Sequence, residues 1–107
     1  MINVLFICSK NQWRSPTAEK IWSRHPSMSV RSAGTRTHAR KTVTFDDIQW
    51  ADIIMVMEHK HKSELQAKFT LTYKTIYVLD IPDHYRYMDP ELISELQACV
   101  LPLLGFE

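Results

Sequence analysis

The sequence predicts an α/β protein: a small, doubly wound domain with four parallel strands in one sheet and helices on both faces. Three observations predict this class. Short β-rich runs alternate with helical patterns, which is typical of repeated βαβ units. Residues 4–7 and 53–57 are unbroken apolar runs, as expected of strands covered on both faces. The 107 residues suit one domain, so we expect a single domain over residues 1–107.

The first half of the chain predicts two strands with a helix between them. After the strand at residues 4–7, Ser15 should cap a helix and Pro16 should occupy its first position. Pro26 should end that helix, because proline cannot continue the backbone hydrogen bonding. Residues 29–33 form the second expected strand.

The second half repeats the alternation of helix and strand. Thr44 should cap a short helix, and residues 53–57 should form the third strand. A polar helix is expected over residues 58–68 and the fourth strand over residues 75–79.

The last helix should open at Asp89-Pro90 and be limited in length by Pro102. In doubly wound sheets, ligands bind outside the carboxyl ends of the strands. Cys8 follows the first strand and therefore lies at that edge.

The segment from Cys8 to Ser15 has the composition of a phosphate-binding catalytic loop. Five residues separate Cys8 from Arg14. The loop N–H groups and a helix N-terminus can converge on a phosphate dianion, while Arg14 can donate to two of its oxygens. Such positive surroundings stabilise a thiolate, so Cys8 could attack phosphorus and form a phospho-cysteine. The alternative for Cys8 is a small buried hydrophobe at a strand end.

A general acid is expected in the segment after the fourth strand. Asp83 lies there, at the same sheet edge as Cys8, and Asp80 competes with it for the role. Asp89 is better explained as a helix cap, and Asp83 could also be a turn residue after Pro82.

Composition excludes several other classes of function. The net charge of +1 gives no field that favours nucleic acid or a membrane surface. Cys8 and Cys99 stand 91 positions apart, so we expect no disulfide framework, no zinc site and no cofactor. His59 and His61 are expected on a solvated helix face rather than on a metal.

The N-terminus has no signal-peptide pattern, so we expect a cytoplasmic protein. No feature indicates an oligomeric state.

Four stretches of this chain resemble the low-molecular-weight protein tyrosine phosphatases. The family signature is an apolar strand followed by Cys-x-Gly-Asn-x-Cys-Arg-Ser-Pro-x-Ala-Glu. Here residues 4–19 read Val-Leu-Phe-Ile-Cys-Ser-Lys-Asn-Gln-Trp-Arg-Ser-Pro-Thr-Ala-Glu. Residues 30–35 (Val-Arg-Ser-Ala-Gly-Thr), 45–58 and 81–85 (Ile-Pro-Asp-His-Tyr) are similar to three further family stretches, in the same order.

The resemblance implies a cysteine-dependent phosphomonoesterase, most simply a protein tyrosine phosphatase that acts on a phosphorylated protein. It implies these roles: Cys8 as nucleophile, Arg14 as phosphate clamp, Asn11 as holder of the loop shape, Ser15 as support of the thiolate, Asp83 as general acid and then base, and Tyr85 at the entrance. Ser9, Lys10, Gln12 and Trp13 complete the expected phosphate-binding loop.

The chain departs from the family pattern at several positions. Lys10 stands at a family glycine, Trp13 at the second loop cysteine, and His84 at the proline after the acid. The chain is also short after Thr35, where the family has a helix and a loop that help line the pocket. Trp13, Tyr85 or Tyr87 could line it instead.

These departures leave three alternatives open. The substrate could be a small non-protein phosphomonoester, or the chain could bind phosphate without catalysis. Arsenate reduction is a further alternative on the same fold, but it needs paired resolving cysteines and only Cys99 is available.

Overall fold

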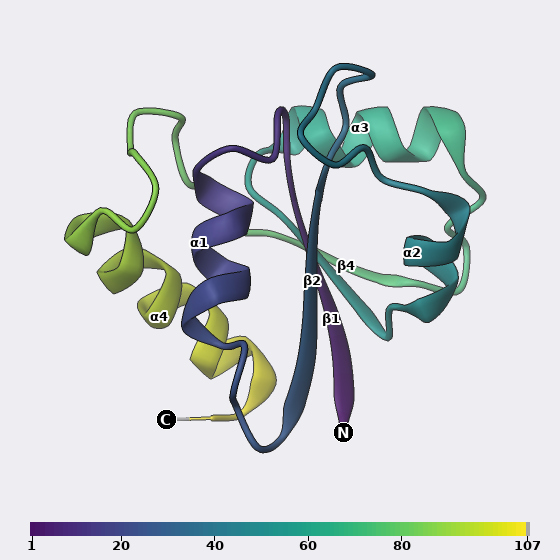
Figure 1. Ribbon diagram of the computed structural model, residues 1–107. Coiled ribbons are helices and arrows are strands. Elements are labelled where there is room, and N and C mark those ends of the chain that lie inside the picture. The colour runs from purple at the N-terminus through teal and green to yellow at the C-terminus, as the bar shows by residue number, and fades with distance from the viewer. Residues whose placement is uncertain (107) are drawn as a thin grey trace.

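The structure, a computed structural model that describes residues 1–106, contains one sheet of four parallel strands in the order β2-β1-β3-β4 (Figure 1). The strands are β1 (Ile2–Cys8), β2 (Met28–Gly34), β3 (Ile53–Val56) and β4 (Thr75–Val78). Parallel pairing runs from Ile2 with Met28 to Cys8 with Gly34 on one side of β1. On its other side, Val4 pairs with Ile53. The predicted fold class is confirmed.

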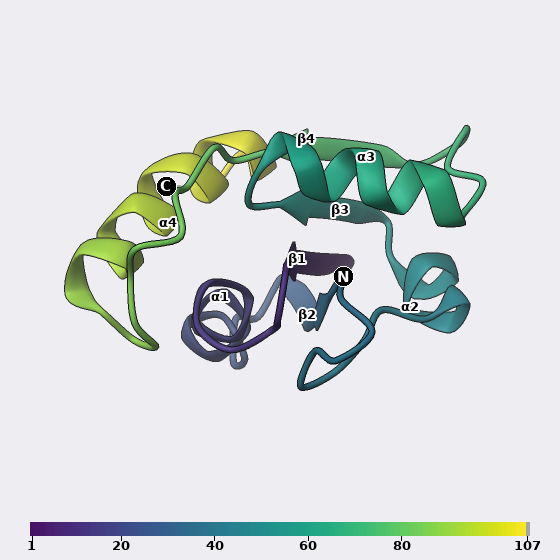
Figure 2. The same ribbon diagram turned by 90° about the horizontal axis from the view of Figure 1, so that it is seen from above.

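Four helices cover the two faces of this sheet. They are α1 (Arg14–Ile21), α2 (Phe45–Trp50), α3 (His59–Lys68) and α4 (Pro90–Leu104). Helices α1 and α4 share one apolar cluster, whereas α2 and α3 contribute to the other. Figure 2, seen from above, shows α1 beside β1 and β2, and α3 beside β3 and β4. Because all the strand pairs are parallel, the four strands end at the same edge of the sheet, which for β1 and β2 is at the top of Figure 1.

Strand β1 is buried on both faces, as its unbroken apolar run predicts. Val4 and Phe6 point into the cluster under α1 and α4, and Leu5 and Ile7 into the cluster under α2 and α3. All four side chains are fully buried. This burial fixes the register of β1, and with it the position of Cys8 at the strand end.

Two expected helix caps are confirmed. The Thr44 hydroxyl accepts from the Asp47 N–H at 3.1 Å, and the Asp47 carboxylate accepts from the Thr44 N–H at 3.1 Å. Asp89 accepts from the Glu91 N–H at 2.9 Å at the start of α4. Both caps satisfy amide groups that have no partner inside their helix.

Two other expected boundaries are wrong. Helix α1 begins at Arg14, so Ser15 is its second residue and not its cap. The chain enters α1 directly from the loop, and the Ser15 hydroxyl bonds to loop side chains instead. Pro102 does not stop α4, which continues to Leu104 and ends at Gly105 with φ of 77°. The left-handed conformation of Gly105, rather than the missing N–H of proline, ends the helix.

Candidate active site

A small hollow of about 70 Å³ opens at the carboxyl end of β1. Seven of the residues singled out in the sequence line it: Cys8, Ser9, Lys10, Gln12, Trp13, Arg14 and Asp83. Residues far apart in the sequence meet here because the segments after β1 and β4 end at the same sheet edge. Asn11 and Ser15 are fully buried and do not line the hollow.

Cys8 is buried, and a hydroxyl group contacts its sulfur. The Cys8 Sγ lies 3.0 Å from the Ser15 Oγ. The Ser15 Oγ also accepts from the Asn11 Nδ2 at 2.8 Å, so its own hydrogen can donate either to sulfur or to the Ala33 carbonyl oxygen, which lies 3.5 Å away. Ser15 therefore lies where it can stabilise a negatively charged sulfur.

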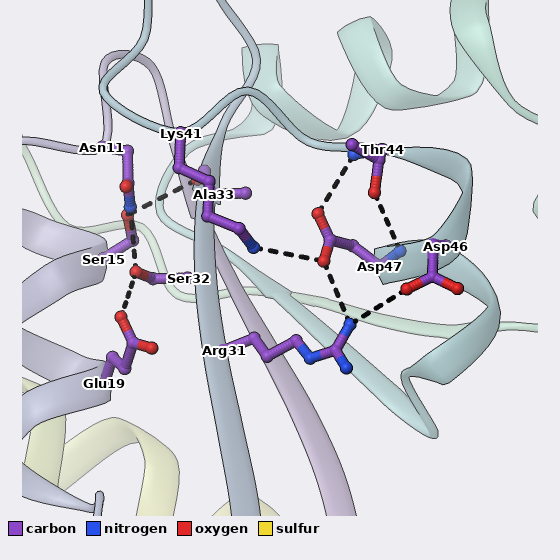
Figure 3. A network of polar contacts seen from close by, with 10 residues as sticks. All are labelled: Asn11, Ser15, Glu19, Arg31, Ser32, Ala33, Lys41, Thr44, Asp46 and Asp47. Carbon is purple, nitrogen blue, oxygen red and sulfur yellow. Dashed lines mark hydrogen bonds and ion pairs between the residues drawn. The ribbon is translucent and has the colours of Figure 1, made fainter.

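Asn11 connects the loop to the neighbouring strand, as Figure 3 shows. Its φ is 55°, in the left-handed region that asparagine tolerates better than most residues. Its Nδ2 also donates to the Ser32 Oγ at 2.9 Å, and Ser32 in turn donates to Glu19 at 2.6 Å. Asn11 Oδ1 is buried and has no hydrogen-bond partner within residues 1–106. This chain of hydrogen bonds stabilises the bend of the loop at Asn11.

The segment 35–41 holds the loop from its outer side. Four loop carbonyl oxygens accept hydrogen bonds of 2.9–3.0 Å from it: Cys8 O from the Thr35 N–H, Ser9 O from the Arg36 N–H, Lys10 O from the Arg40 N–H and Asn11 O from the Arg40 side chain. In a trans peptide, the carbonyl group of one residue and the N–H group of the next residue point in opposite directions. The N–H groups of residues 9–12 therefore face away from segment 35–41.

These N–H groups are free to bind a ligand. Among the described residues, no amide N–H of residues 9–13 donates to a protein group. They lie at the N-terminus of α1, where the helix dipole adds partial positive charge. Lys10 has no positive φ, so its side chain is compatible with this loop shape. The arrangement is a cradle for an anion.

Arg14 is almost fully buried, and hydrogen bonds hold its guanidinium group in one position. Its Nη1 donates to Glu58 Oε2 at 2.6 Å and to the Ile81 carbonyl at 2.8 Å. Its Nε lies 3.5 Å from Asp83 Oδ1, and the Asp83 side chain is 54% exposed. Burial raises the pKa of Glu58, but the bond to Arg14 and its charge outweigh that effect and lower the pKa overall. No role for Glu58 was expected from the sequence. Its position directly after the third apolar run, at the same sheet edge as Cys8, is the signal that points to it.

His61 is buried against the loop, so the expected solvated face is wrong for this residue. It is fully buried, and its Nε2 lies 2.8 Å from the Ser9 Oγ. Its Nδ1 accepts from the Glu58 N–H at 3.1 Å. Burial, helped by the nearby charge of Arg14, lowers the pKa of His61 to about 4. The missed signal is the pair His61 and Leu65, four residues apart on one face of an otherwise polar helix.

Tyr85 does not flank the entrance, which corrects the expected role. It is buried in the apolar cluster beneath α4 and does not line the hollow. Tyr87, two residues later, is 49% exposed and lines a groove of about 570 Å³ that shares Gln12 and Trp13 with the hollow. Asp80, the competing acid, is exposed, with φ of 60°, and is not among the residues of the hollow.

Residues 1–106 contain neither a cluster of metal-ligating side chains nor a membrane-spanning helix. No three His, Cys, Asp or Glu side chains come together as a metal site. None of the described helices has the length and apolar character needed to span a membrane.

Comparison with known proteins gives a partial sequence match and an extended structural one. Residues 3–44 match the family described as Low molecular weight phosphotyrosine protein phosphatase. A search of curated protein sequences gave no match. A low molecular weight protein tyrosine phosphatase from Streptococcus pyogenes superposes with a TM-score of 0.81 at 20% identity, over 98% of this chain and 92% of that one.

Two structures of YwlE proteins are also similar. A mutant of YwlE from Bacillus subtilis has a TM-score of 0.71 at 22% identity, over 97% of this chain and 99% of that one. The YwlE arginine phosphatase from Geobacillus stearothermophilus has a TM-score of 0.74 at 19% identity, over 98% of this chain and 94% of that one. The resemblance seen in the sequence is thus confirmed: the chain has the fold of the low molecular weight phosphotyrosine protein phosphatases and matches their family over residues 3–44.

Proposed function

We propose that the protein is a cysteine-dependent phosphomonoesterase, in first place a protein tyrosine phosphatase. One observation carries the proposal: the unpartnered N–H groups of residues 9–13 form a cradle at the N-terminus of α1, with Cys8 at its base and Arg14 at its side. A phosphoryl group fits this arrangement because its oxygens need several converging donors.

In the proposed first step, the Cys8 thiolate attacks phosphorus and the bond from phosphorus to the leaving oxygen breaks. Asp83 donates a proton to that oxygen. In the second step, Asp83 takes a proton from water, which attacks phosphorus and breaks the bond to sulfur. Phosphate leaves, and Cys8 returns to the thiolate. Asp83 is more than half exposed, so water can reach it.

Arg14 would neutralise the phosphoryl oxygens through both steps. The bonds from Nη1 to Glu58 and to Ile81 O fix the guanidinium plane before the substrate binds. Such a preformed clamp loses little entropy on binding and needs no reorganisation when the charge on the phosphoryl oxygens changes during the reaction.

The groove beside the hollow supports a phosphoprotein over a small phosphomonoester. It is far larger than the hollow, at about 570 Å³ against about 70 Å³, and Trp13 and Tyr87 present exposed rings there. Residues that flank the phosphorylated side chain of a substrate can occupy this groove. The relatives in this fold include tyrosine and arginine phosphatases, so both kinds of phosphorylated peptide belong in the test.

The test is hydrolysis of an aryl phosphate and of phosphotyrosine, phosphoarginine and small-metabolite phosphates. We expect wild type to release phosphate and Cys8→Ser to release none while it still binds inorganic phosphate. Full activity in Cys8→Ser contradicts the mechanism. Phosphate binding without turnover in wild type would favour a binding module instead.

The assignment of the acid is tested with Asp83→Asn, against Asp80→Asn as the matched control. Removal of a general acid lowers kcat by about 10²–10⁴-fold, and the loss grows as the leaving group becomes more basic. Asp80→Asn should hydrolyse all esters at the wild-type rate, because Asp80 does not line the hollow.

A further inference from the structure

We propose that the Ser9 hydroxyl is a side-chain ligand of the phosphoryl group and that His61 is the positioning residue that aims it. The inference rests on the proposed phosphatase function and adds a donor that the backbone cradle and Arg14 do not supply. Ser9 follows the nucleophile directly, and His61 lies 52 residues further along, in the first turn of α3.

The tautomer of His61 follows from its two hydrogen bonds. The Glu58 N–H can only donate, so the Nδ1 that receives it at 3.1 Å carries no hydrogen. The ring proton of the neutral imidazole is therefore on Nε2, which donates to the Ser9 Oγ at 2.8 Å. The direction of the hydrogen bond is thus fixed from the helix towards the loop.

The Ser9 hydroxyl hydrogen is left without an acceptor. Ser9 Oγ accepts from His61, and no other hydrogen bond of this hydroxyl exists within residues 1–106. Ser9 is 7% exposed and lines the hollow with Cys8 and Arg14. A phosphoryl oxygen bound in the hollow is the acceptor that this geometry leaves open. A hydroxyl that already accepts from a donor is also polarised and becomes a stronger donor itself.

The first turn of α3 thereby holds the loop at both ends. Glu58 bonds to Arg14, and His61 bonds to Ser9, while the bond from the Glu58 N–H to His61 joins the two. Ser9 and Arg14 are the residues one and six positions after Cys8. A ligand that contacts both Ser9 and Arg14 would therefore be bound on two sides by groups that the first turn of α3 holds in place.

Two substitutions of His61 separate its two contacts. In His61→Asn, the side-chain oxygen lies near the former Nδ1 and can keep the bond from the Glu58 N–H, but it cannot reach Ser9. In His61→Gln, the amide nitrogen lies near the former Nε2 and can still donate to Ser9. Ser9→Ala removes the proposed ligand, and Ser9→Thr keeps the hydroxyl.

The first readout is the dissociation constant of inorganic phosphate, alongside kcat and KM. A hydrogen bond to a charged group is worth about 1.5–3 kcal/mol, so Ser9→Ala should weaken phosphate binding by about 10–100-fold. Ser9→Thr should restore it. His61→Asn should weaken binding in the wild-type background and have no further effect in Ser9→Ala, because the residues act through one contact. His61→Gln should bind more tightly than His61→Asn.

Each opposite result overturns the inference. Unchanged phosphate binding in Ser9→Ala shows that the hydroxyl is not a ligand. Equal losses from His61→Asn in both backgrounds show that His61 acts by another route, such as overall stability, which thermal unfolding of each variant monitors. Failure of the proposed function is distinct: wild type then hydrolyses no ester, although phosphate binding still depends on Ser9.

Nitrogen-15 NMR of the imidazole supplies a readout that is independent of activity. We expect His61 in the Nε2–H form at neutral pH, unchanged in Cys8→Ser. An Nδ1–H form, or a protonated ring at pH 7, removes the fixed direction of the hydrogen bond and with it the inference.

Discussion

Gly34 ends β2 where the segment 35–41 turns back over the loop of residues 8–13. A Cβ at this position would lie 2.5 Å from the Ser9 carbonyl oxygen and 2.7 Å from the Ala39 Cβ. The Ser9 oxygen cannot withdraw freely, because it accepts from the Arg36 N–H at 3.0 Å. Close approach of the two segments, and not a special φ, therefore requires glycine here.

Gly34→Ala should accordingly disturb the loop and the fold together. We expect a loss of about 1–3 kcal/mol in the free energy of unfolding, as for other overpacked sites, together with weaker phosphate binding. Denaturant unfolding and phosphate titration measure both. Gly105→Ala is the control: it should lose stability only, because its Cβ meets nothing within 4 Å and its cost is the positive φ. Normal phosphate binding in Gly34→Ala would contradict this role.

The burial of His61 makes stability depend on pH in a defined window. Four charged groups affect the pKa of its imidazole: Arg14 from α1, Glu58 at the start of α3, and Lys60 and Glu64 within α3. Because the folded pKa of about 4 lies below the ordinary value of 6.5, the unfolded state binds the proton first as pH falls. Stability is unaffected above pH 6.5 and declines from there to about pH 4.

The size of this decline follows from the displacement of the pKa. We expect about 3 kcal/mol between pH 6.5 and about 4, measured as the difference between wild type and His61→Asn in denaturant unfolding. Asp47→Asn is the control. Bonds to Thr44 and Lys41 outweigh burial and lower the pKa of Asp47, so its contribution is lost only as pH falls below 3.8. A parallel pH profile for wild type and His61→Asn would refute the assignment.

At the scale of elements, the sequence predicts the start of a helix well where a polar side chain serves only as the cap. It predicts the start poorly where the same side chain bonds to other residues of the site. Among the described residues the Thr44 hydroxyl has no competing partner, and it caps α2 as expected. Ser15 has the same capping chemistry, but Cys8 and Asn11 engage its hydroxyl, so α1 begins earlier. Both partners lie in the loop that precedes α1, and the Ser15-Pro16 pattern alone does not decide between a cap and a bond to the thiolate.

Helix α3 shows a second limit of prediction from sequence. Its polar composition predicts a solvated helix, and most of the helix is exposed. The buried residues of α3 are only His61 and Leu65, too little apolar surface to produce a clear period. By contrast, the meeting of Cys8, Arg14 and Asp83 could be predicted, because Cys8 ends β1 and the other two lie in the segments that follow β1 and β4 at the same edge of the sheet.

The cap of α2 gives a test at this scale. Thr44→Ala should cost about 1 kcal/mol of unfolding free energy, because the Asp47 N–H loses its acceptor. Thr72→Ala is the matched control, since Thr72 is exposed and makes no side-chain hydrogen bond among the described residues. Phosphate binding should stay at the wild-type value in both. Equal stability of the two variants would contradict the cap.

For the molecule as a whole, one sheet joins every element of the site. The central strand β1 pairs with both β2 and β3, and the loops that follow these strands, together with the loop after β4, contribute to the hollow or its supports. Loss of any strand would therefore displace the site. We predict that the chain is a single cooperative domain and that a ligand in the hollow stabilises all of it.

Inorganic phosphate should raise the unfolding temperature without broadening the transition. At 100 times its dissociation constant, a ligand that binds only the folded state adds about 2.7 kcal/mol. For a domain of this size, that corresponds to roughly 10 °C or more. Calorimetry at constant ionic strength, with chloride in place of phosphate, measures the shift. Arg14→Lys should lose most of it, and two separate transitions would contradict a single domain.

Trp13, which stands on the loop itself, also gives the binding site an optical signal. Of the three tryptophans, Trp22 is buried against Phe6 and Trp50 lies under Arg31, whereas Trp13 is 39% exposed beside the hollow. A ligand that reaches the loop should change the fluorescence emission of this ring and leave that of the other two unchanged. Emission should then follow phosphate concentration in wild type and be unresponsive in Trp13→Phe, so that occupancy can be followed in real time without a label.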